Sequence, residues 1–247
     1  MTDETIPFNH VAIIMDGNRR WAKKHGLDVI EGHKKGSEVF RESVKWCCEL
    51  GIKEYTVYAF SCENWNRTER EVSDLMSLFA LYTDEVIKTM KNDKESIYNQ
   101  VRLRFIGRRD RLSRELLQKM EKLEKESKNN SLLLVNVCLD YSGQWDIAQS
   151  CMKIVQNTRM QCLLDETPSI STVEEMANQI AANLSTGDSP VDVVIRTGGE
   201  HRISNFLLWQ ISYAEIFVVD SFWPDFTCVE LRKALMEIAR RNRRFGK

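Results

Sequence analysis

The sequence predicts a single α/β domain over residues 1–247, with a mainly parallel β-sheet and helices on both of its faces. Short runs rich in β-branched and aromatic residues alternate with longer segments in which apolar residues recur every three or four positions. Strands that are separated by helices need crossover connections, and these make neighbouring strands parallel. The chain contains no internal repeat, low-complexity segment or linker rich in Pro, Gly and Ser, so nothing divides it into smaller domains.

The first half of the chain shows the alternation clearly. The apolar run at 11–15 predicts a buried strand, and the helix that follows ends before Gly51. The segment EYTVYAF at 54–60 is a strand by its aromatic and β-branched content. A long amphipathic helix is expected at 71–90, because its apolar residues fall at three- and four-residue spacing. The segment at 101–107 alternates as a half-exposed strand does.

The second half continues the same pattern. The segment 111–127 has helical spacing with a heavily charged outer face, and 131–141 is apolar almost throughout, as a buried parallel strand is. The remaining elements are expected as helices at 146–158, 172–184 and 227–242 and as strands at 191–196 and 215–220.

Composition excludes several classes of protein. Lys and Arg number 35 against 36 Asp and Glu, so the net charge of −1 gives no reason to expect nucleic acid as a partner. The seven cysteines are odd in number and form no CxxC pair, which favours reduced thiols over a zinc site or a disulfide framework. The N-terminus lacks the layout of a signal peptide, and no apolar run reaches the ~18 residues that span a bilayer. The sequence therefore predicts a cytoplasmic protein.

Three polar loops follow predicted strands, at the edge where open parallel sheets bind their ligands. They read DGNRRW after 11–15, SCENWNR after 54–60, and RTGGEHRISN at 196–205. Glycines in the first and third loops let backbone N–H groups approach an anion closely. Asp16 and Glu215 are oxygen ligands of the kind that Mg²⁺ takes alongside substrate phosphates. Together with guanidinium groups suited to phosphate oxygens, these features predict a diphosphate–metal site, whose arginines are Arg19, Arg20, Arg67, Arg196 and Arg202.

Each of these residues also has an ordinary structural interpretation. An isolated Asp-Gly-Asn is most often a turn, and an arginine after a strand usually lies on a solvated rim. His33 alone would be a hydrogen-bonded structural histidine, and Trp21 and Trp65 would pack in the core. Neither a P-loop nor a GxGxxG fingerprint is present in the sequence. Only the coincidence of three such loops at one sheet edge favours a binding site.

Two arginine-rich runs lie outside these loops, RLRFIGRRDRLSR at 102–114 and RRNRR at 240–244. Neither has the interleaved aromatic residues on which nucleic-acid bases stack. We therefore expect a solvated or subunit-facing surface at both runs, and no contact with nucleic acid.

Long motifs resemble those of the cis-prenyltransferases, the undecaprenyl diphosphate synthase family: HVAIIMDGNRRWAKKHG…GHKKG, YAFSCENWNR and DVVIRTGGEHRISNFLLWQISYAE…WPDF. They occur in the family's order from about residue 9 to the C-terminus. The resemblance implies head-to-tail condensation of isopentenyl diphosphate onto an allylic diphosphate, with a Z double bond formed at each step. It further implies Mg²⁺ as cofactor, a homodimer, and helices enclosing a hydrophobic tunnel for the growing chain. Because a polyprenyl product must leave for a bilayer, peripheral membrane contact belongs to the same expectation.

The resemblance also implies roles for individual residues. Asp16 would bind Mg²⁺ and assist departure of the allylic diphosphate, and Glu215 would be the second metal-linked acid. His33, Asn64 and Ser61 match positions associated with proton removal and diphosphate handling, although an amide is a poor general base and Asn64 is expected to orient the substrate instead. The matching substrate-binding residues are Gly17, Asn18, Arg19, Arg20, Trp21, Glu63, Trp65 and Arg67, together with Arg196, His201, Arg202 and Ser204 at the isopentenyl diphosphate site.

Two parts of the chain carry further expectations from the family pattern. The closing RRFG matches an Arg-x-Gly element, Arg244 and Gly246, that reaches a neighbouring subunit's site. Product length is expected to depend on bulky side chains at the tunnel floor, each of which is equally an ordinary core residue: Leu75, Phe79, Tyr82 and Leu134.

Departures from the pattern leave alternatives open. Val29 aligns with a position where many members carry arginine, and Gln144 and Ser142 replace an Arg and a Gly of bacterial members. A missing arginine weakens a diphosphate contact, which keeps open a variant prenyltransferase with an unusual acceptor or a short product. A non-catalytic accessory subunit is the other alternative. Such subunits generally lose the Asp-Gly-Asn segment and the Ser-x-x-Asn loop, and this chain keeps both.

Overall fold

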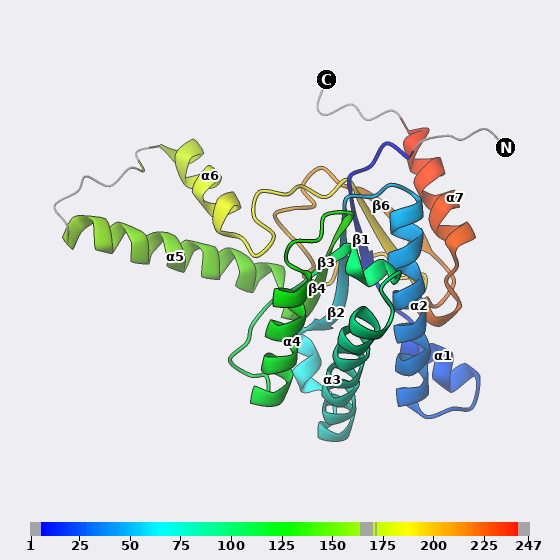
Figure 1. The fold of residues 1–247 in the computed structure, drawn as a ribbon. Coiled ribbons are helices and arrows are strands. Elements are labelled where there is room, and N and C mark those ends of the chain that lie inside the picture. The colour runs from blue at the N-terminus through cyan, green and yellow to red at the C-terminus, as the bar shows by residue number, and fades with distance from the viewer. Residues whose placement is uncertain (1–5, 164–169, 171, 242–247) are drawn as a thin grey trace.

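A six-stranded β-sheet forms the centre of the molecule, in the order β3-β4-β2-β1-β5-β6 (Figure 1). The structure is a computed structural model that describes residues 6–163, 170 and 172–241. All five pairings between neighbouring strands are parallel, as the alternation of strands and helices predicts. The strands are β1 (His10–Ile14), β2 (Glu54–Ser61), β3 (Val101–Ile106), β4 (Leu133–Tyr141), β5 (Val193–Thr197) and β6 (Glu215–Val219).

The described ranges also contain seven α-helices, of which the last follows the final strand. They are α1 (Asn18–Lys24), α2 (Val29–Glu49), α3 (Glu69–Asn92), α4 (Arg114–Ser127), α5 (Gly143–Leu163), α6 (Val173–Asn183) and α7 (Cys228–Ala239). Three short 3₁₀ turns, η1 (Cys62–Asn66), η2 (Ile97–Asn99) and η3 (Trp223–Asp225), complete the elements. None of the helices in this part of the chain has both the length and the apolar character needed to cross a bilayer.

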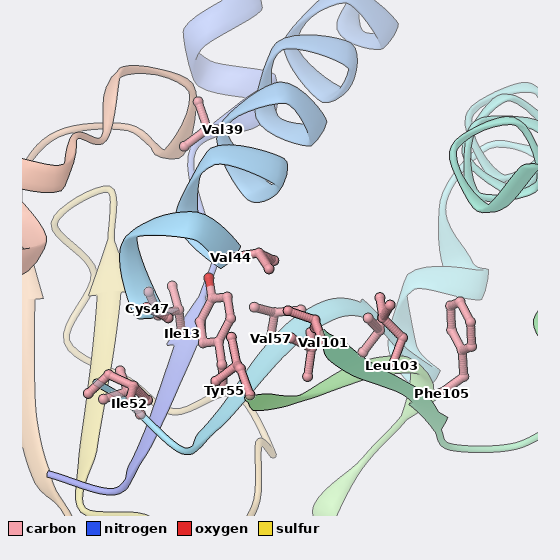
Figure 2. Close-up of a cluster of buried hydrophobic side chains, with 14 of the residues drawn as sticks. Ile13, Val39, Val44, Cys47, Ile52, Tyr55, Val57, Val101, Leu103 and Phe105 are labelled. Atoms are coloured by element: carbon pink, nitrogen blue, oxygen red, sulfur yellow. The ribbon is translucent and has the colours of Figure 1, made fainter. Parts of the chain in front are cut away.

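The two faces of the sheet bury different clusters, because successive strand residues point to opposite sides. Val11 and Ile13 of β1 belong to the larger cluster, to which α2, α3, α4 and α7 contribute buried residues. Figure 2 shows part of this cluster, with Ile13 beside Val44 and Cys47 of α2. Ala12 and Ile14 belong to a smaller cluster on the other face, where Phe206 and other residues of the β5–β6 connection pack. Helices α5 and α6 extend away from the body of the molecule (Figure 1).

Helix α1 stands where the sequence predicts only a loop. Ala22 is its one buried residue, so the apolar periodicity by which a packed helix is recognised is absent. Its composition of Ala, Arg and Lys nevertheless favours helix. The helix begins directly after Gly17, whose φ of 111° lies in the left-handed region. A Cβ at Gly17 would lie 2.7 Å from Phe222, so the turn is also sterically closed to larger residues.

The first arginine-rich run is partly solvated, since Arg102, Arg111 and Arg114 are exposed. Three of its guanidinium groups are used inside the chain: Arg104 donates to Asn136, Arg109 to Glu124, and Arg111 to Asp140. The Asp140 side chain is fully buried. Charge patterning could not reveal these pairs, because the partners lie on other elements, β4 and α4. The predicted Arg-x-Gly element at Arg244 and Gly246 lies outside the described residues.

Candidate active site

The three polar loops meet at the carboxyl edge of the sheet, as the parallel topology requires. They follow β1, β2 and β5, which are adjacent strands in the order β2-β1-β5. Hydrogen bonds join the first loop to the third, since the Thr197 hydroxyl donates to the Asp16 carbonyl at 2.7 Å. Trp223 of η3 donates its backbone N–H to the same carbonyl at 2.9 Å. Segments more than 180 residues apart in sequence are thereby held together.

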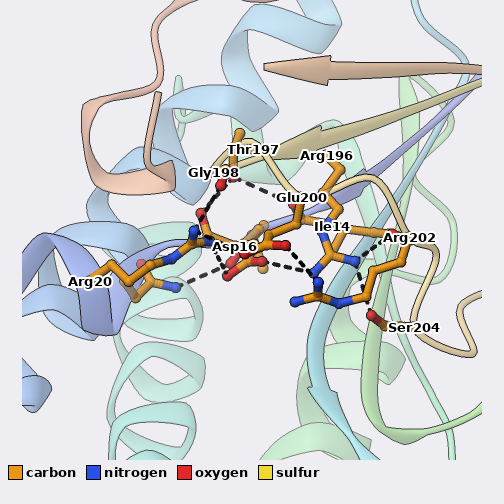
Figure 3. A network of polar contacts seen from close by, with 11 residues as sticks. Ile14, Asp16, Arg20, Arg196, Thr197, Gly198, Glu200, Arg202 and Ser204 are labelled. Atoms are coloured by element: carbon orange, nitrogen blue, oxygen red, sulfur yellow. Dashed lines mark hydrogen bonds and ion pairs between the residues drawn. The ribbon is translucent and has the colours of Figure 1, made fainter. Parts of the chain in front are cut away.

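A network of charged side chains surrounds Asp16 (Figure 3). Its carboxylate accepts a hydrogen bond from Arg196 Nη2 at 2.8 Å and lies 3.2 Å from Arg20 Nη2. Arg196 also donates to the Ser204 hydroxyl at 2.9 Å and to the carbonyl of Arg202. The Arg196 side chain is only 6% exposed, so its charge depends on these partners for compensation.

Carboxylates are shared between arginines throughout the site. Asp16 lies between Arg20 and Arg196, and Glu200 lies 3.3 Å from Arg20 and 2.6 Å from Arg202. In the third such group, Glu71 of α3 lies 2.9 Å from Arg67 and 3.7 Å from Arg19. Five guanidinium groups therefore meet three carboxylates, and these eight side chains carry a net charge of +2. An excess of positive charge at a sheet edge suits an anionic ligand.

The surroundings of Asp16 keep its side chain ionised. Partial burial alone would raise its pKa, but the hydrogen bond from Arg196 and the positive charge of Arg20 hold that pKa below the ordinary value. Asp16 is thus an anionic oxygen donor at neutral pH, and its side chain remains 27% exposed.

His33 of α2 faces the same region in a neutral state. Burial, together with the positive charges of Arg67 and Arg19, lowers its pKa to about 4. Its Nε2 atom is buried and has no hydrogen-bond partner among the described residues. The sequence allowed a hydrogen-bonded structural histidine here, but an unpartnered ring nitrogen beside two arginines fits a binding role better.

The second loop forms the turn η1 and is fixed by its own side chains. Asn64 Oδ1 accepts a hydrogen bond from the Ser61 backbone N–H at 3.1 Å. Glu63 accepts one from Asn205 Nδ2 at 3.0 Å, which joins this loop to the third. Arg67 follows the turn and pairs with Glu71 one helical turn further on. Ser61 and Asn64 are therefore held close together.

A cavity of about 690 Å³ opens beside these loops. Ten of the predicted site residues line it: Asp16, Asn18, His33, Ser61, Glu63, Asn64, Arg67, Arg196, Arg202 and Ser204. The rest of its wall is mainly apolar and comes from helices α2, α3 and α4 and strands β2, β3 and β4, including Phe40, Leu75, Leu78, Phe79, Val86, Phe105, Leu123 and Val137. The cavity thus has a polar end at the sheet edge and an apolar interior.

Three of the four residues expected at the tunnel floor line this cavity, namely Leu75, Phe79 and Tyr82. Leu134 does not. Its neighbours Val135 and Val137 belong to the cluster on the cavity side, so Leu134, one position out of phase, faces the other side of the sheet. The expectation for Leu134 is corrected by the pleat of β4.

A second cavity of about 680 Å³ lies beside α1, and Asp16, Asn18, His33 and Arg67 belong to the walls of both. Its other charged residues are Arg19, Arg20, Lys23 and Asp28, and Gly17 and Val29 also line it. Lys23 is not among the site residues that the sequence predicts. The signal that could have found it is the helical spacing from Arg19 and Arg20 to Lys23.

Four predicted site residues lie away from both cavities. Trp21 donates to Asp225 and its ring lies tilted against that of His25, and Trp65 packs edge-on against Phe60. His201 lines a separate surface pocket. Glu215 begins β6 in register with Val193, which pairs with Val11 at the start of β1, whereas Asp16 follows the end of β1. Within one chain, Glu215 and Asp16 therefore lie at opposite ends of the sheet and do not form a common metal site.

The donor set nevertheless suits a divalent cation that is shared with a substrate. Among the residues that the structure describes, no three His, Cys, Asp or Glu side chains are grouped as a metal cluster would require. Mg²⁺ is usually held by one or two carboxylates with substrate phosphates and water as further ligands. The ionised and partly exposed Asp16, beside an arginine-rich cavity, matches that requirement.

Comparisons with known proteins agree with the geometry. A family model described as putative undecaprenyl diphosphate synthase matches residues 14–246. An isoprenyl transferase of Aquifex aeolicus is 45% identical over 241 residues, which cover 96% of this chain and 95% of the relative. The ditrans,polycis-undecaprenyl-diphosphate synthase ((2E,6E)-farnesyl-diphosphate specific) of Escherichia coli K12 is 44% identical, with 96% and 89% covered.

Solved structures share the fold over nearly the whole chain. Lavandulyl diphosphate synthase from Lavandula x intermedia, in complex with dimethylallyl diphosphate, superposes with a TM-score of 0.88 at 30% identity, covering 99% of this chain and 100% of that one. A probable undecaprenyl diphosphate synthase from Campylobacter jejuni gives a TM-score of 0.77 at 29% identity, with 97% and 99% covered.

Proposed function

The chain belongs to the undecaprenyl diphosphate synthase family of cis-prenyltransferases, and we propose that it extends an allylic diphosphate to a long Z-polyprenyl diphosphate. It is a prenyl transferase that condenses isopentenyl diphosphate with an allylic diphosphate, the reaction of this family. One observation supports the long product above all. The arginine-rich edge of the sheet opens directly into an apolar cavity of about 690 Å³, so charged and hydrocarbon parts of one ligand have adjoining sites.

In this proposal the arginines hold the two diphosphate groups. Arg19 and Arg20 of α1, with the backbone N–H groups that follow Gly17, face the second cavity and would take the allylic diphosphate. Arg196, Arg202 and Ser204 would take isopentenyl diphosphate, because they line the large cavity beside them. Cleavage of the allylic C–O bond places negative charge on the leaving diphosphate, and fixed guanidinium groups stabilise that charge as it develops.

Asp16 is the residue we assign to Mg²⁺, with the diphosphate oxygens as its other ligands. When bound, the cation would neutralise charge on the departing diphosphate. The chain's own part is to supply an ionised carboxylate at the point where both cavities meet. We do not place Glu215 beside it, because Glu215 lies at the amino end of β6.

Proton loss from the new cation needs only a weak acceptor. His33 is neutral at pH 7, and its Nε2 atom has no partner among the described residues, so it can accept a hydrogen bond or a proton in the cavity. We assign an orienting role to Asn64, because its side-chain oxygen already accepts from the Ser61 backbone. Ser61 lines the cavity at the same edge, and its side chain accepts a hydrogen bond from the Asn64 backbone N–H.

A short product is the second candidate, favoured by the similarity to lavandulyl diphosphate synthase and by Val29, where many members carry arginine. The large cavity argues against it, since its volume far exceeds what a five-carbon dimethylallyl group fills. Its apolar lining would contribute about 0.8 kcal/mol for each methylene group buried. The geometry therefore supports repeated condensation.

We further propose a homodimer, supported by apolar side chains that α5 and α6 leave exposed. Met152, Val155 and Met160 of α5 are each more than half exposed, and Val173 of α6 is 80% exposed. Two such helices projecting from the body suit a symmetric interface (Figure 1). Light scattering after gel filtration should give twice the chain mass, and Val155→Glu should shift the species to monomer; a wild-type monomer contradicts the proposal.

Product release supports one more proposal, peripheral contact with a membrane. A long polyprenyl diphosphate is an amphiphile whose apolar chain is stable only in a bilayer or in the protein. Flotation with phospholipid vesicles should recover the protein after product formation and not before substrate is added. Equal recovery in both states would contradict product-linked contact.

The decisive experiment for function sizes the products. The protein is incubated with radiolabelled isopentenyl diphosphate, Mg²⁺ and allylic diphosphates of five, ten or fifteen carbons, and products are separated by chain length. We expect one primer to give a product several units longer than itself. A single condensation with every primer would establish the short-product alternative, and no incorporation at all would favour an accessory subunit.

A further inference from the structure

Asn205 occupies a strained position between the elements of the active site. Its φ is 61°, and Ser204 and Leu207 beside it have φ values of 50° and 43°. Side chains rarely adopt this left-handed region, and asparagine tolerates it better than most. A segment with three such residues in four positions persists only where contacts fix it.

Three contacts fix Asn205, and they come from different parts of the chain. Its Oδ1 accepts a hydrogen bond from the Gln144 backbone N–H at 3.0 Å, and its carbonyl accepts one from the Gly143 N–H at 2.6 Å. Both donors belong to the first turn of α5, whose N–H groups have no partner within the helix. Its Nδ2 donates to Glu63 of η1 at 3.0 Å. The side chain thus connects the β5–β6 loop to α5 on one side and to η1 on the other.

We propose that Asn205 is a positioning residue that sets the distance between the two loops that receive the substrates. The proposal rests on the function proposed above. On one side, Glu63 stands between Ser61 and Asn64. On the other, Ser204 accepts from Arg196, which is paired with Asp16. One amide therefore links the pair Ser61 and Asn64 to the arginines of the other loop.

This arrangement has a consequence for catalysis. Condensation needs the two substrates in a fixed relative position, and a displacement of about 1 Å can cost about 100-fold in rate. The loops meet through side chains, since η1 and the β5–β6 loop follow β2 and β5, which are separated in the sheet by β1. The hydrogen bond between the Asn205 side-chain amide and Glu63 joins the two loops at the wall of the 690 Å³ cavity. Asn205 needs no contact with a reacting atom to fill this role.

Exchanging the donor and the acceptor tests the link. In Asn205→Asp, Oδ1 can still accept from Gln144, but a second carboxylate faces Glu63, and the like charges repel. In the double variant with Glu63→Gln, the glutamine amide donates to the new carboxylate, so the hydrogen bond is restored in the opposite direction. Asn205→Gly keeps the left-handed backbone and removes both side-chain bonds. Asn99→Asp, the same chemical change on η2, is the matched control.

We expect Asn205→Asp to lower kcat/KM for isopentenyl diphosphate about tenfold or more, and to raise hydrogen exchange of the 61–67 amides about threefold. The double variant should recover both quantities to within about threefold of wild type. Asn205→Gly should resemble Asn205→Asp, and Asn99→Asp should resemble wild type. Thermal unfolding of Asn205→Asp should change little, since an aspartate also caps the start of α5.

Two results would overturn the positioning role. One is an Asn205→Asp protein whose exchange at 61–67 equals that of wild type. The other is a double variant no better than Asn205→Asp in exchange and in kcat/KM. Hydrogen exchange is measured without substrate, so it tests the link even if wild type makes no product, an outcome that would instead overturn the proposed function.

Discussion

The replacement of Asp16 by asparagine tests the central assignment of the site. The asparagine side chain keeps the size of the original and an oxygen that accepts from Arg196, but it removes the negative charge between Arg196 and Arg20. If Asp16 holds Mg²⁺ and assists diphosphate departure, this single charge matters more to the reaction than to the fold. Asp16→Asn should therefore separate loss of rate from loss of stability.

The structure sets the expected magnitudes. Arg196 is buried with a 6% exposed side chain, whereas Asp16 is 27% exposed, so their pair lies between a surface pair and a fully buried one. Removing one partner of a buried pair costs about 3–5 kcal/mol, and exposed pairs contribute about 0–1 kcal/mol. Ser204 and the Arg202 carbonyl still accept from Arg196 in the variant. We expect a destabilisation of about 1–2 kcal/mol and a fall in kcat of about 100- to 1,000-fold.

The assay measures incorporation of radiolabelled isopentenyl diphosphate across a Mg²⁺ titration, with urea unfolding of the same preparations. Glu200→Gln is the matched control, because Glu200 also lies between two arginines, Arg20 and Arg202, at the more exposed rim. It should reduce kcat by less than about fivefold. Near-normal turnover of Asp16→Asn with unchanged Mg²⁺ dependence would refute the metal–diphosphate assignment.

Three further predictions concern residues around the two cavities. The pKa of His33 is about 4 in the folded chain and ordinarily 6.5, so the unfolded chain binds more protons between these values. The contribution of neutral His33 to the free energy of unfolding is therefore complete above pH 6.5 and declines as the pH falls to 4. Between pH 7 and pH 5, the free energy of unfolding measured with urea should fall by about 2 kcal/mol less in His33→Gln than in wild type. Equal decreases in the two proteins would contradict the burial of His33 in a neutral form. Arg19 and Val29 line one cavity, so Arg19→Ala should weaken allylic diphosphate binding about tenfold by calorimetry, and Val29→Arg added to it should restore affinity. Lys24→Ala, on the exposed side of α1, should not change affinity; equal effects of the two α1 variants would show a non-specific charge effect. Gly36→Ala places a Cβ against the Asn18 side chain and 2.9 Å from Trp223, so it should lower stability by about 1–3 kcal/mol and kcat with it, and an unchanged Tm would contradict this packing.

The fold could be predicted because its strongest signals are local. The strands are short segments that are either apolar or alternate apolar and polar residues, and most helices between them carry an apolar face, so order and type follow from periodicity. Helix α1 escaped prediction because it buries only Ala22 and shows no such face. The face of the sheet toward which Leu134 points could not be predicted either. In a continuous apolar run such as β4, the residue pattern does not show which positions face which side.

The site could be predicted in outline because parallel topology brings strand ends together whatever the loops contain. Which loop residues then touch is a matter of long-range partners, and the sequence carries little trace of these. Trp65 illustrates the point, since it follows the predicted strand as expected but packs against Phe60 and beneath Arg111. Glu215 is a stronger example of a residue whose position the sequence motif does not reveal. Its motif is intact, yet it stands at the start of its strand, where ligand-binding residues of a parallel sheet do not gather.

The sharing of carboxylates explains how the site can exist before a substrate arrives. Five arginines close to one another would repel, and Arg196 is almost fully buried, so an uncompensated cluster would be costly. Asp16, Glu200 and Glu71 each hold two of them apart, and an excess of two positive charges remains. A diphosphate can take up that excess without displacing any carboxylate. A second diphosphate cannot, because the same guanidinium groups would then face more negative than positive charge. Binding both substrates therefore calls for further positive charge at Asp16, and a divalent cation shared with the diphosphates supplies it.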